Sequence, residues 1–263
     1  MRWGFAMRPV LLVYLGAVFV FVFAPIAASV VFSFNSDRFP TVPLGSFTYH
    51  WYETAFSDPD IWEAFKNSLI VAVSAASLST LIGFATAYTD FRYGFRFKAG
   101  YLALALLPPT VPLIILALAM LAWLSQIGLS GTLLGVIAAH TVLGAPFAMA
   151  VTRLRLAQMD PALEAAAWNL GASEWGAMRH VVLPFCAPAI LSAFCLTAAV
   201  SFDEFAVAWF VSGLNRTVPV AILEILQGNV DPQINAIGTV VFLTSMTLVI
   251  AAQLLLMVRE RKS

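Results

Sequence analysis

The chain has 263 residues, 61% of them apolar and only 11% charged, and its 14 basic and 14 acidic side chains give a formal net charge of zero. About a quarter of the residues in a typical soluble domain are charged. The composition therefore argues against a soluble enzyme and indicates a membrane protein.

Six apolar runs are long enough to cross a bilayer core of about 30 Å, which takes roughly 20 helical residues. The first run is longer than the apolar core of about 7 to 15 residues found in cleavable signal peptides, so we expect an uncleaved anchor helix. The fold class that follows is an all-α membrane protein with six transmembrane helices. The predicted spans are residues 10–33, 67–88, 99–123, 132–152, 187–205 and 235–258.

Basic residues are concentrated on one side of these spans. Of the 14, 11 lie before the first span, after the second, after the fourth or after the last, and only Arg38, Lys66 and Arg216 fall on the other side. Lys and Arg are enriched in cytoplasmic loops. The distribution therefore predicts that both termini are cytoplasmic.

The predicted outer segment, residues 35–66, combines five acidic residues with several aromatic ones. Aromatic side chains favour the headgroup boundary, so interfacial structure with a short amphipathic helix would explain it. The alternative is that the segment helps to receive a soluble substrate-binding protein and that its acids attract a cationic solute.

Small residues and prolines mark contacts and bends within the spans. Helices in lipid associate by packing and hydrogen bonding, so the small residues of 71–79 and 138–150 predict close helix contacts. Pro108, Pro109 and Pro112 remove backbone donors near the start of the third span and predict a bend there. That bend either lines a pathway or shapes the bundle.

A polar, helix-forming segment separates the fourth and fifth spans and reads LEAAAWNLGASEWGAMRHVVLP over residues 163–184. Asp160 and Pro161 precede it as an N-cap and a first helical residue. Gly171 suits the left-handed conformation that ends many helices. The segment resembles the cytoplasmic signature loop of ATP-binding-cassette importer permeases. The resemblance implies a coupling helix that fits a groove on the ATPase subunit and carries its closing motion to the pore.

The match to that loop is displaced at one position. The family pattern is Glu-Ala-Ala, three residues, Gly, nine residues, an aliphatic residue, one residue and Leu-Pro. Counting back from Gly171 puts Ala165 where the Glu is expected, with Glu164 one position early, whereas the second half keeps its spacing. We therefore expect Glu164 to replace only part of the charge contact that the family Glu makes. The residues that the resemblance assigns to coupling are Glu164, Ala165, Ala166, Ala167, Gly171, Ala172, Leu183 and Pro184.

Residues 201–213 (SFDEFAVAWFVSG) and 229–239 (NVDPQINAIGT) resemble the carboxy-terminal half of spermidine/putrescine-type permeases. Asp203 and Glu204 end an otherwise uncharged span, and an acid at mid-membrane costs about 2.5 to 3.5 kcal/mol, so such acids normally face a cavity or a partner. We expect this pair to bind the ammonium groups of a diamine through charge-assisted hydrogen bonds. The alternatives are that the acids lie at the water boundary, cap a helix or pair with Arg216.

Two aromatic residues beside this acidic pair have two possible roles. Phe205 and Trp209 either add cation–π contacts to a transported amine or anchor the helix at the membrane interface.

Other chemistry is sparse in the sequence. The phosphate-loop pattern G-x-x-x-x-G-K-[ST] is missing, so we expect no cofactor in this chain and ATP with magnesium on a partner ATPase. Its three histidines have no nucleophile or metal partner by spacing, so we expect neither catalytic nor metal-binding residues. Cys186 and Cys195 lack metal or disulfide spacing and are expected to be packing residues.

The two resemblances imply the permease fold of a type I importer in a bacterial inner membrane. We expect an anchor helix and external segment over residues 1–66, a permease core over 67–258 that includes the coupling loop 153–184, and a cytoplasmic tail over 259–263. The implied partners are an ATPase dimer, a second and different permease subunit, a substrate-binding protein and the lipid bilayer, with no nucleic acid.

The implied function is that of a non-enzymatic transport subunit, which forms half of the path for a small cationic solute by alternating access. A polyamine such as putrescine or spermidine is the expected cargo. The alternatives within this class are an aminophosphonate, an amino-acid-like compound, an opine or iron. An alternative from another class is an ATP-independent channel or carrier.

Overall fold

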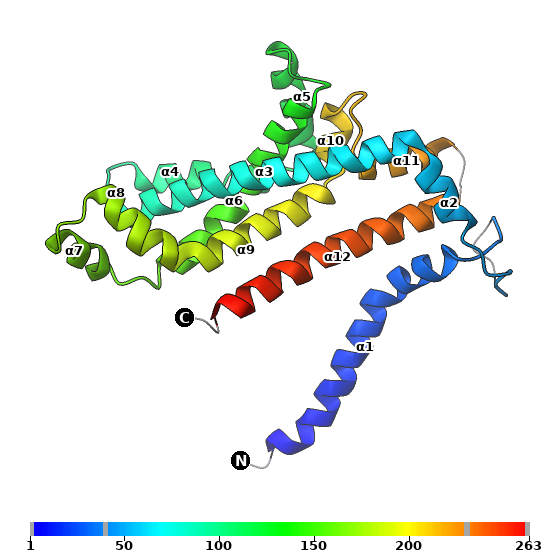
Figure 1. Cartoon of the computed structure of the whole chain (residues 1–263), viewed down its shortest axis with the longest axis horizontal. Helices are drawn as coiled ribbons and strands as arrows, with labels where there is room; N and C mark the ends of the chain where they lie inside the picture. The colour runs from blue at the N-terminus through cyan, green and yellow to red at the C-terminus, as the bar shows by residue number, and fades with distance from the viewer. Residues whose placement is uncertain (1–2, 39–41, 229–231, 261–263) are drawn as a thin grey trace. The chain divides into compact units, whose positions relative to one another are not determined.

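A computed structural model of the chain describes residues 3–38, 42–228 and 232–260, and it is helical throughout these ranges apart from turns and an isolated antiparallel bridge between Asn35 and Phe47 (Figure 1). This confirms the all-helical class expected from the apolar runs. The α-helices are α1 Trp3–Phe32, α2 His50–Ser57, α3 Pro59–Arg92, α4 Lys98–Ala105, α5 Leu113–Gln126, α6 Leu133–Leu156, α7 Ala162–Asn169, α8 Glu174–Ala177, α9 Leu183–Phe202, α10 Ala206–Val211, α11 Val218–Gly228 and α12 Gln233–Glu260, with a 3-10 turn at Pro108–Thr110 and a π-helical turn at Met178–Val182.

Four helical stretches within the described residues are long and apolar enough to cross a membrane, namely Val10–Phe32, Pro59–Arg92, Leu133–Leu156 and Glu174–Phe202. They correspond to the first, second, fourth and fifth predicted spans. The sixth predicted span lies within α12, which has 28 residues. The third is divided between α4 and α5, because Pro108, Pro109 and Pro112 fall at the break between them. Figure 1 shows α5 running across the direction of α3 and α9.

The chain forms two compact units. The first comprises residues 1–62 and 222–244, and the second comprises residues 63–221 and 245–263. In the first unit, the predicted short helix of the outer segment is α2. Phe34, Phe47, Tyr49 and Tyr52 gather their rings before and within this helix. The Trp51 indole N–H donates to the Asn35 carbonyl at 2.7 Å, which holds α2 against the end of α1.

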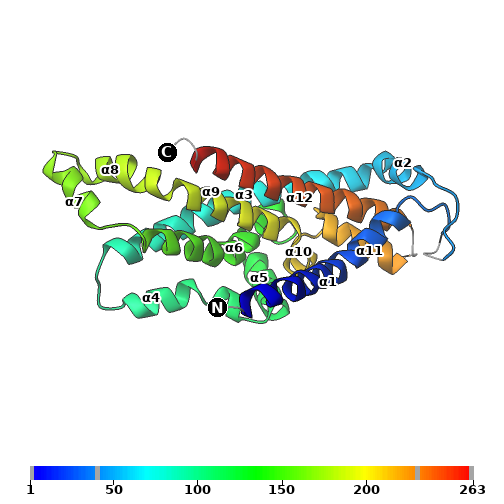
Figure 2. The ribbon, with the colours of Figure 1, turned by 90° about the horizontal axis from the view of Figure 1, so that it is seen from below.

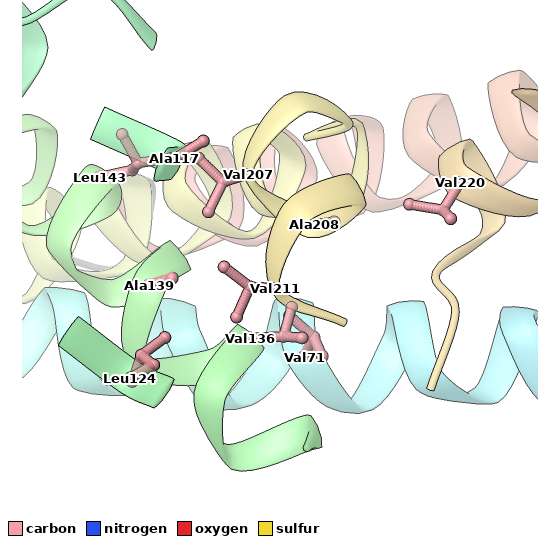
Figure 3. Close-up of a cluster of buried hydrophobic side chains, with 10 residues drawn as sticks. All are labelled: Val71, Ala117, Leu124, Val136, Ala139, Leu143, Val207, Ala208, Val211 and Val220. Carbon is pink, nitrogen blue, oxygen red and sulfur yellow. The ribbon is translucent and has the colours of Figure 1, made fainter. Parts of the chain in front are cut away.

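The second unit has two apolar clusters. One joins α3, α5, α6, α10 and the start of α11, and Figure 3 shows Val207 and Val211 of α10 among side chains of α5 and α6. The other joins α3, α6 and α9 around Met149 and Leu156, at the ends of these helices nearest to the α6–α9 connection. Figure 2 shows α7 and α8 at one end of these helices. The second cluster therefore packs the helix ends from which the connection between α6 and α9, with α7 and α8, extends.

Two glycines let α3, α6 and α9 approach closely, as the small-residue faces predicted. A Cβ atom at Gly83 of α3 would lie 2.5 Å from the Met149 amide nitrogen of α6. A Cβ atom at Gly144 of α6 would lie 2.5 Å from the Ser79 hydroxyl of α3 and 3.5 Å from the Thr197 Cβ of α9. An added methyl group would therefore displace the α6 backbone at Gly83 and the Ser79 side chain at Gly144, whereas it would meet α9 at an ordinary contact distance.

Gly83→Ala is expected to lower the stability of the detergent-solubilised protein by about 1–3 kcal/mol, the usual cost of overpacking a tight contact. Thermal unfolding followed by size-exclusion chromatography measures the change. The matched control is Gly100→Ala in α4, where an added Cβ meets nothing within 4 Å. Alanine favours a helix more than glycine does, so this control should be neutral or slightly stabilising. Equal melting temperatures for the two variants would contradict the close contact.

Candidate functional site

The loop between α6 and α9 contains a short helix, α7, which begins at Ala162, one residue later than the sequence predicted, and ends before Gly171 as predicted. The Asp160 carboxylate accepts a hydrogen bond from the Ala162 amide at 2.9 Å, where α7 begins. At the other end, Gly171 has a φ of +87° and the Ala172 amide donates to the Ala167 carbonyl at 3.0 Å. This is the glycine-dependent ending in which a late amide satisfies a free helix carbonyl. Glycine is required at that φ, because a side chain would be strained there.

The outer surface of the loop is apolar or small. Ala165 and Ala166 are exposed on α7, Leu170 is 90% exposed beyond its end, and Trp175 is 69% exposed in α8. Leu163 is also exposed. Large apolar side chains that are this exposed and lie within one short stretch of the chain indicate an interaction surface. We call these five residues the α7 surface.

The inner side of α7 carries Glu164, Ala167 and Trp168, which follow the spacing of one helical face. Glu164 is only 3% exposed. Its carboxylate accepts a hydrogen bond from the Tyr88 hydroxyl at 2.9 Å and lies 3.6 Å from the Arg92 Nε atom. Glu164 therefore faces helix α3 of its own chain and points away from the α7 surface.

The second half of the loop is tied to α6. The Ser173 hydroxyl accepts from the Gly176 amide at 3.1 Å and caps α8. The Arg155 Nε atom donates to the Phe185 carbonyl at 3.1 Å, and its guanidinium lies 4.1 Å from the Phe185 ring. Leu183 is partly buried and Pro184 is exposed at the start of α9. This anchoring holds the Leu-Pro end of the predicted motif in place.

Charged residues also join the ends of three helices beside this loop. Asp90 of α3 is buried, and its carboxylate lies 2.6 Å from the Arg153 Nε atom of α6 and 3.1 Å from the Lys98 Nζ atom of α4. Our sequence reasoning assigned no role to Asp90 or Tyr88, because their partners lie far away along the chain. The available signal was the position of these polar residues at the end of an apolar span.

The second candidate site lies where α9 ends and α10 begins. Asp203 follows α9 and is exposed, and its Oδ1 atom accepts a hydrogen bond from the Ser245 hydroxyl at 3.4 Å. Glu204 is buried, and its carboxylate accepts from the Val207 and Ala208 amides, with a shortest distance of 2.9 Å. Glu204 thus caps α10, as one of the alternatives drawn from the sequence proposed.

Glu204 also has a partner that our sequence reasoning missed. His140 of α6 is 2% exposed, its Nε2 atom lies 3.2 Å from the Glu204 carboxylate, and its Nδ1 atom lies 2.8 Å from the Ser201 hydroxyl. The available signal was the position of His140 inside a predicted span, where an ionisable side chain needs a partner. The neighbouring acids therefore differ, since Glu204 is fully engaged within the protein and Asp203 keeps an exposed carboxylate.

The two aromatic residues beside these acids pack inward. The Phe205 and Trp209 rings are 6.0 Å apart, and both side chains are partly buried against the first apolar cluster. Their contacts thus include the core formed by α5, α6 and α10.

Glu204→Ala is expected to destabilise the protein by about 1–2 kcal/mol through loss of the helix cap, with a further loss because His140 keeps a buried nitrogen without its carboxylate partner. The control is Asp203→Ala at the adjacent exposed position, which should unfold like the parent. Thermal unfolding in detergent measures both. Equal destabilisation of the two variants would contradict the assignment of the cap to Glu204.

Comparison with known proteins identifies the family to which the chain belongs. Residues 79–261, which include the loop and the Asp203–Glu204 pair, match the family model described as the inner membrane component of binding-protein-dependent transport systems. The chain is 31% identical over 243 residues to the spermidine/putrescine transport system permease protein PotC of Haemophilus influenzae, covering 92% of this chain and 94% of that protein. It is also 31% identical over 235 residues to the putrescine transport system permease protein PotI of Escherichia coli, covering 85% of this chain and 82% of that protein.

A solved structure shows the same fold. A bacterial ABC transporter involved in the import of the acidic polysaccharide alginate contains a chain that superimposes with a TM-score of 0.74 at 16% sequence identity, covering 97% of this chain and 98% of that chain. The architecture is thus that of a type I ABC importer permease, and the relatives named above are transport subunits rather than enzymes. The chain belongs to the family of inner membrane components of binding-protein-dependent transport systems, as a multi-pass permease subunit of a bacterial inner membrane.

Proposed function

We propose that this permease subunit forms half of the translocation path of an ATP-driven polyamine importer and that the α7 surface docks on a separate ATPase subunit. The observation that carries the docking role is the outward presentation of Ala165, Ala166, Leu170 and Trp175 on a capped helix. An apolar surface of this kind is costly in water and suits a groove in a partner protein. ATP and magnesium would be bound by the ATPase chain.

Within the loop, the residues have different parts in the proposed coupling. Ala165 and Ala166 offer a close approach to the ATPase because their side chains are small. Gly171 and Ala172 shape the end of α7, and Leu183 and Pro184 fix the start of α9. Ala167 and Glu164 lie on the side of α7 with less exposure, so they act from within the permease.

A polyamine is the cargo that the relatives and the chemistry of the α9–α10 junction favour together. The PotC and PotI relatives are named for spermidine/putrescine and putrescine transport, respectively. Asp203 supplies an exposed carboxylate that can form a charge-assisted hydrogen bond with an ammonium group. Glu204 supports the path indirectly by fixing the start of α10. Phe205 and Trp209 pack against the first apolar cluster, and in this proposal the part of each ring that stays exposed would make a cation–π contact to the amine.

The proposed complex contains two different permease subunits, two ATPase subunits and a substrate-binding protein that delivers the solute. Both termini of this chain would face the cytoplasm, as the distribution of basic residues predicts. ATP binding would close the ATPase pair, and the loop would carry that motion to the path. Such coupling requires that ATP and solute each favour one conformation over the other.

The test is uptake of labelled putrescine and spermidine by proteoliposomes that contain the full complex. Uptake should require ATP and every ATPase subunit, and uptake that persists without ATPase subunits would identify a channel or carrier instead. Unlabelled aminophosphonate, opine, amino acid and iron competitors test the cargo. Strong ATP-dependent uptake of one of these, with no polyamine uptake, would retain the importer and replace the polyamine.

A further inference from the structure

Four side chains join α7 to the last two turns of α3. The Tyr88 hydroxyl donates to the Glu164 carboxylate at 2.9 Å, and the Arg92 Nε atom lies 3.6 Å from the same carboxylate. The Arg92 guanidinium also lies 4.6 Å from the Trp168 ring. Each helix thus contributes two side chains, and Arg92 contacts both residues of α7. We call Tyr88, Arg92, Glu164 and Trp168 the α3–α7 latch.

The burial of Glu164 shows that this contact is built into the fold. Its side chain is 3% exposed, whereas Ala165 and Ala166, the next two residues of α7, are exposed. A buried carboxylate is strongly unfavourable unless it is paired and hydrogen-bonded. Tyr88 and Arg92 supply the hydrogen bond and the opposite charge from α3, so the buried position of Glu164 depends on α7 lying against α3.

The displaced position of the glutamate explains its direction. Successive residues of an α-helix are rotated by about 100° around its axis. A glutamate at position 165 would replace the exposed Ala165 on the α7 surface, but one position earlier it turns towards α3. The shift of one residue therefore exchanges a charge on the outer surface for a contact inside the permease.

The latch also gives α7 a connection to the bundle besides its two chain linkers. The peptide chain connects α7 to α6 on one side and to α8 on the other. The latch connects it to α3, and α3 in turn packs tightly on α6 at Gly83, less than two turns before Tyr88. A displacement of α7 would therefore reach α3 directly through the side chains of Tyr88 and Arg92.

We propose that the α3–α7 latch transmits ATPase motion from the coupling loop to α3, and that Glu164 is a positioning residue that acts through Tyr88 and Arg92. This inference rests on the proposed docking of the α7 surface on an ATPase. Loss of the latch should leave docking and ATP hydrolysis intact, but the motion of the ATPase should no longer reach α3 efficiently. The number of solute molecules imported per ATP hydrolysed should consequently fall.

The experiment compares Tyr88→Phe, Glu164→Gln and the double variant in the reconstituted complex. Both substitutions nearly preserve shape. Tyr93→Phe is the matched control, because Tyr93 lies in the same turn region with an exposed side chain. Uptake per ATP hydrolysed should fall by about two- to thirtyfold in each latch variant, the range for residues within a coupling network. Because both single changes act through one contact, the double variant should be no worse than the poorer single variant.

Docking is measured separately, with a photoreactive amino acid at Leu170 that cross-links to the ATPase subunit. Normal cross-linking with reduced uptake per ATP supports the latch. Unchanged uptake per ATP overturns it, as does a loss of cross-linking in Tyr88→Phe, since the latch residues would then only shape the docking surface. No cross-linking in the parent complex would instead overturn the proposed docking. Thermal unfolding identifies any variant that fails to fold. Tyr88→Phe removes only one oxygen atom, so it should disturb folding least.

Discussion

Leu170→Asp should reduce ATP-driven uptake by about tenfold or more, because a carboxylate at the centre of an apolar docking surface would lose its hydration without gaining a partner. The Leu170 side chain is 90% exposed, so the substitution should leave the permease folded. The expected cause is weaker binding of the ATPase subunit. Co-purification of the ATPase and uptake into proteoliposomes measure the two effects.

Leu214→Asp provides a matched control for this prediction. Leu214 is 88% exposed and lies between α10 and α11, outside the loop. A carboxylate there should alter neither co-purification nor uptake. If both leucine variants transport normally and retain the ATPase, the α7 surface is not the docking surface.

Asp203→Asn should reduce uptake of labelled putrescine by about tenfold or more. The change removes the negative charge and leaves the size of the side chain unchanged, and hydrogen bonds to charged groups contribute about 1.5 to 3 kcal/mol. Because Asp203 is exposed and Glu204 supplies the helix cap, the Asn variant should fold normally. Uptake at several putrescine concentrations distinguishes weaker binding from slower transport.

Asp203→Glu is the charge-preserving control and should retain a substantial part of the uptake. The ATPase subunit should also co-purify equally with both Asp203 variants, because the α9–α10 junction lies outside the coupling loop. Wild-type polyamine uptake by Asp203→Asn would exclude Asp203 from the substrate path.

The sequence was most informative where local chemistry decides the structure. Local sequence determines the hydrogen bond from Ala162 to Asp160, the left-handed ending at Gly171 and the break at Pro108 and Pro112, because each depends on residues close together in the chain. The pairing of His140 with Glu204 depends instead on how α6 and α9 pack, and spacing along the chain carries no record of it. For this reason the two adjacent acids seemed equivalent in the sequence, whereas the fold gives them different environments.

The direction of Glu164 could be predicted only in part from the sequence. Its displacement by one residue was visible in the sequence, and helical geometry alone predicts a rotation of about 100°. Finding what Glu164 would meet after that rotation required the position of Tyr88 and Arg92 on α3. A departure from a family pattern is thus most informative when it is converted into a direction around a helix.

The glycine contacts at Gly83 and Gly144 restrict how this permease can deform. Met149 fits against Gly83 and Ser79 fits against Gly144 because glycine has no side chain. If α3 slid along α6, Met149 and Ser79 would meet larger residues instead, so shear motion between these helices is disfavoured. Hinge motion would therefore have to occur in segments outside these two contacts. Alternating access would then be a rotation of α3 and α6 together as one rigid unit. The segments that connect this unit to the rest of the chain would set how far it rotates.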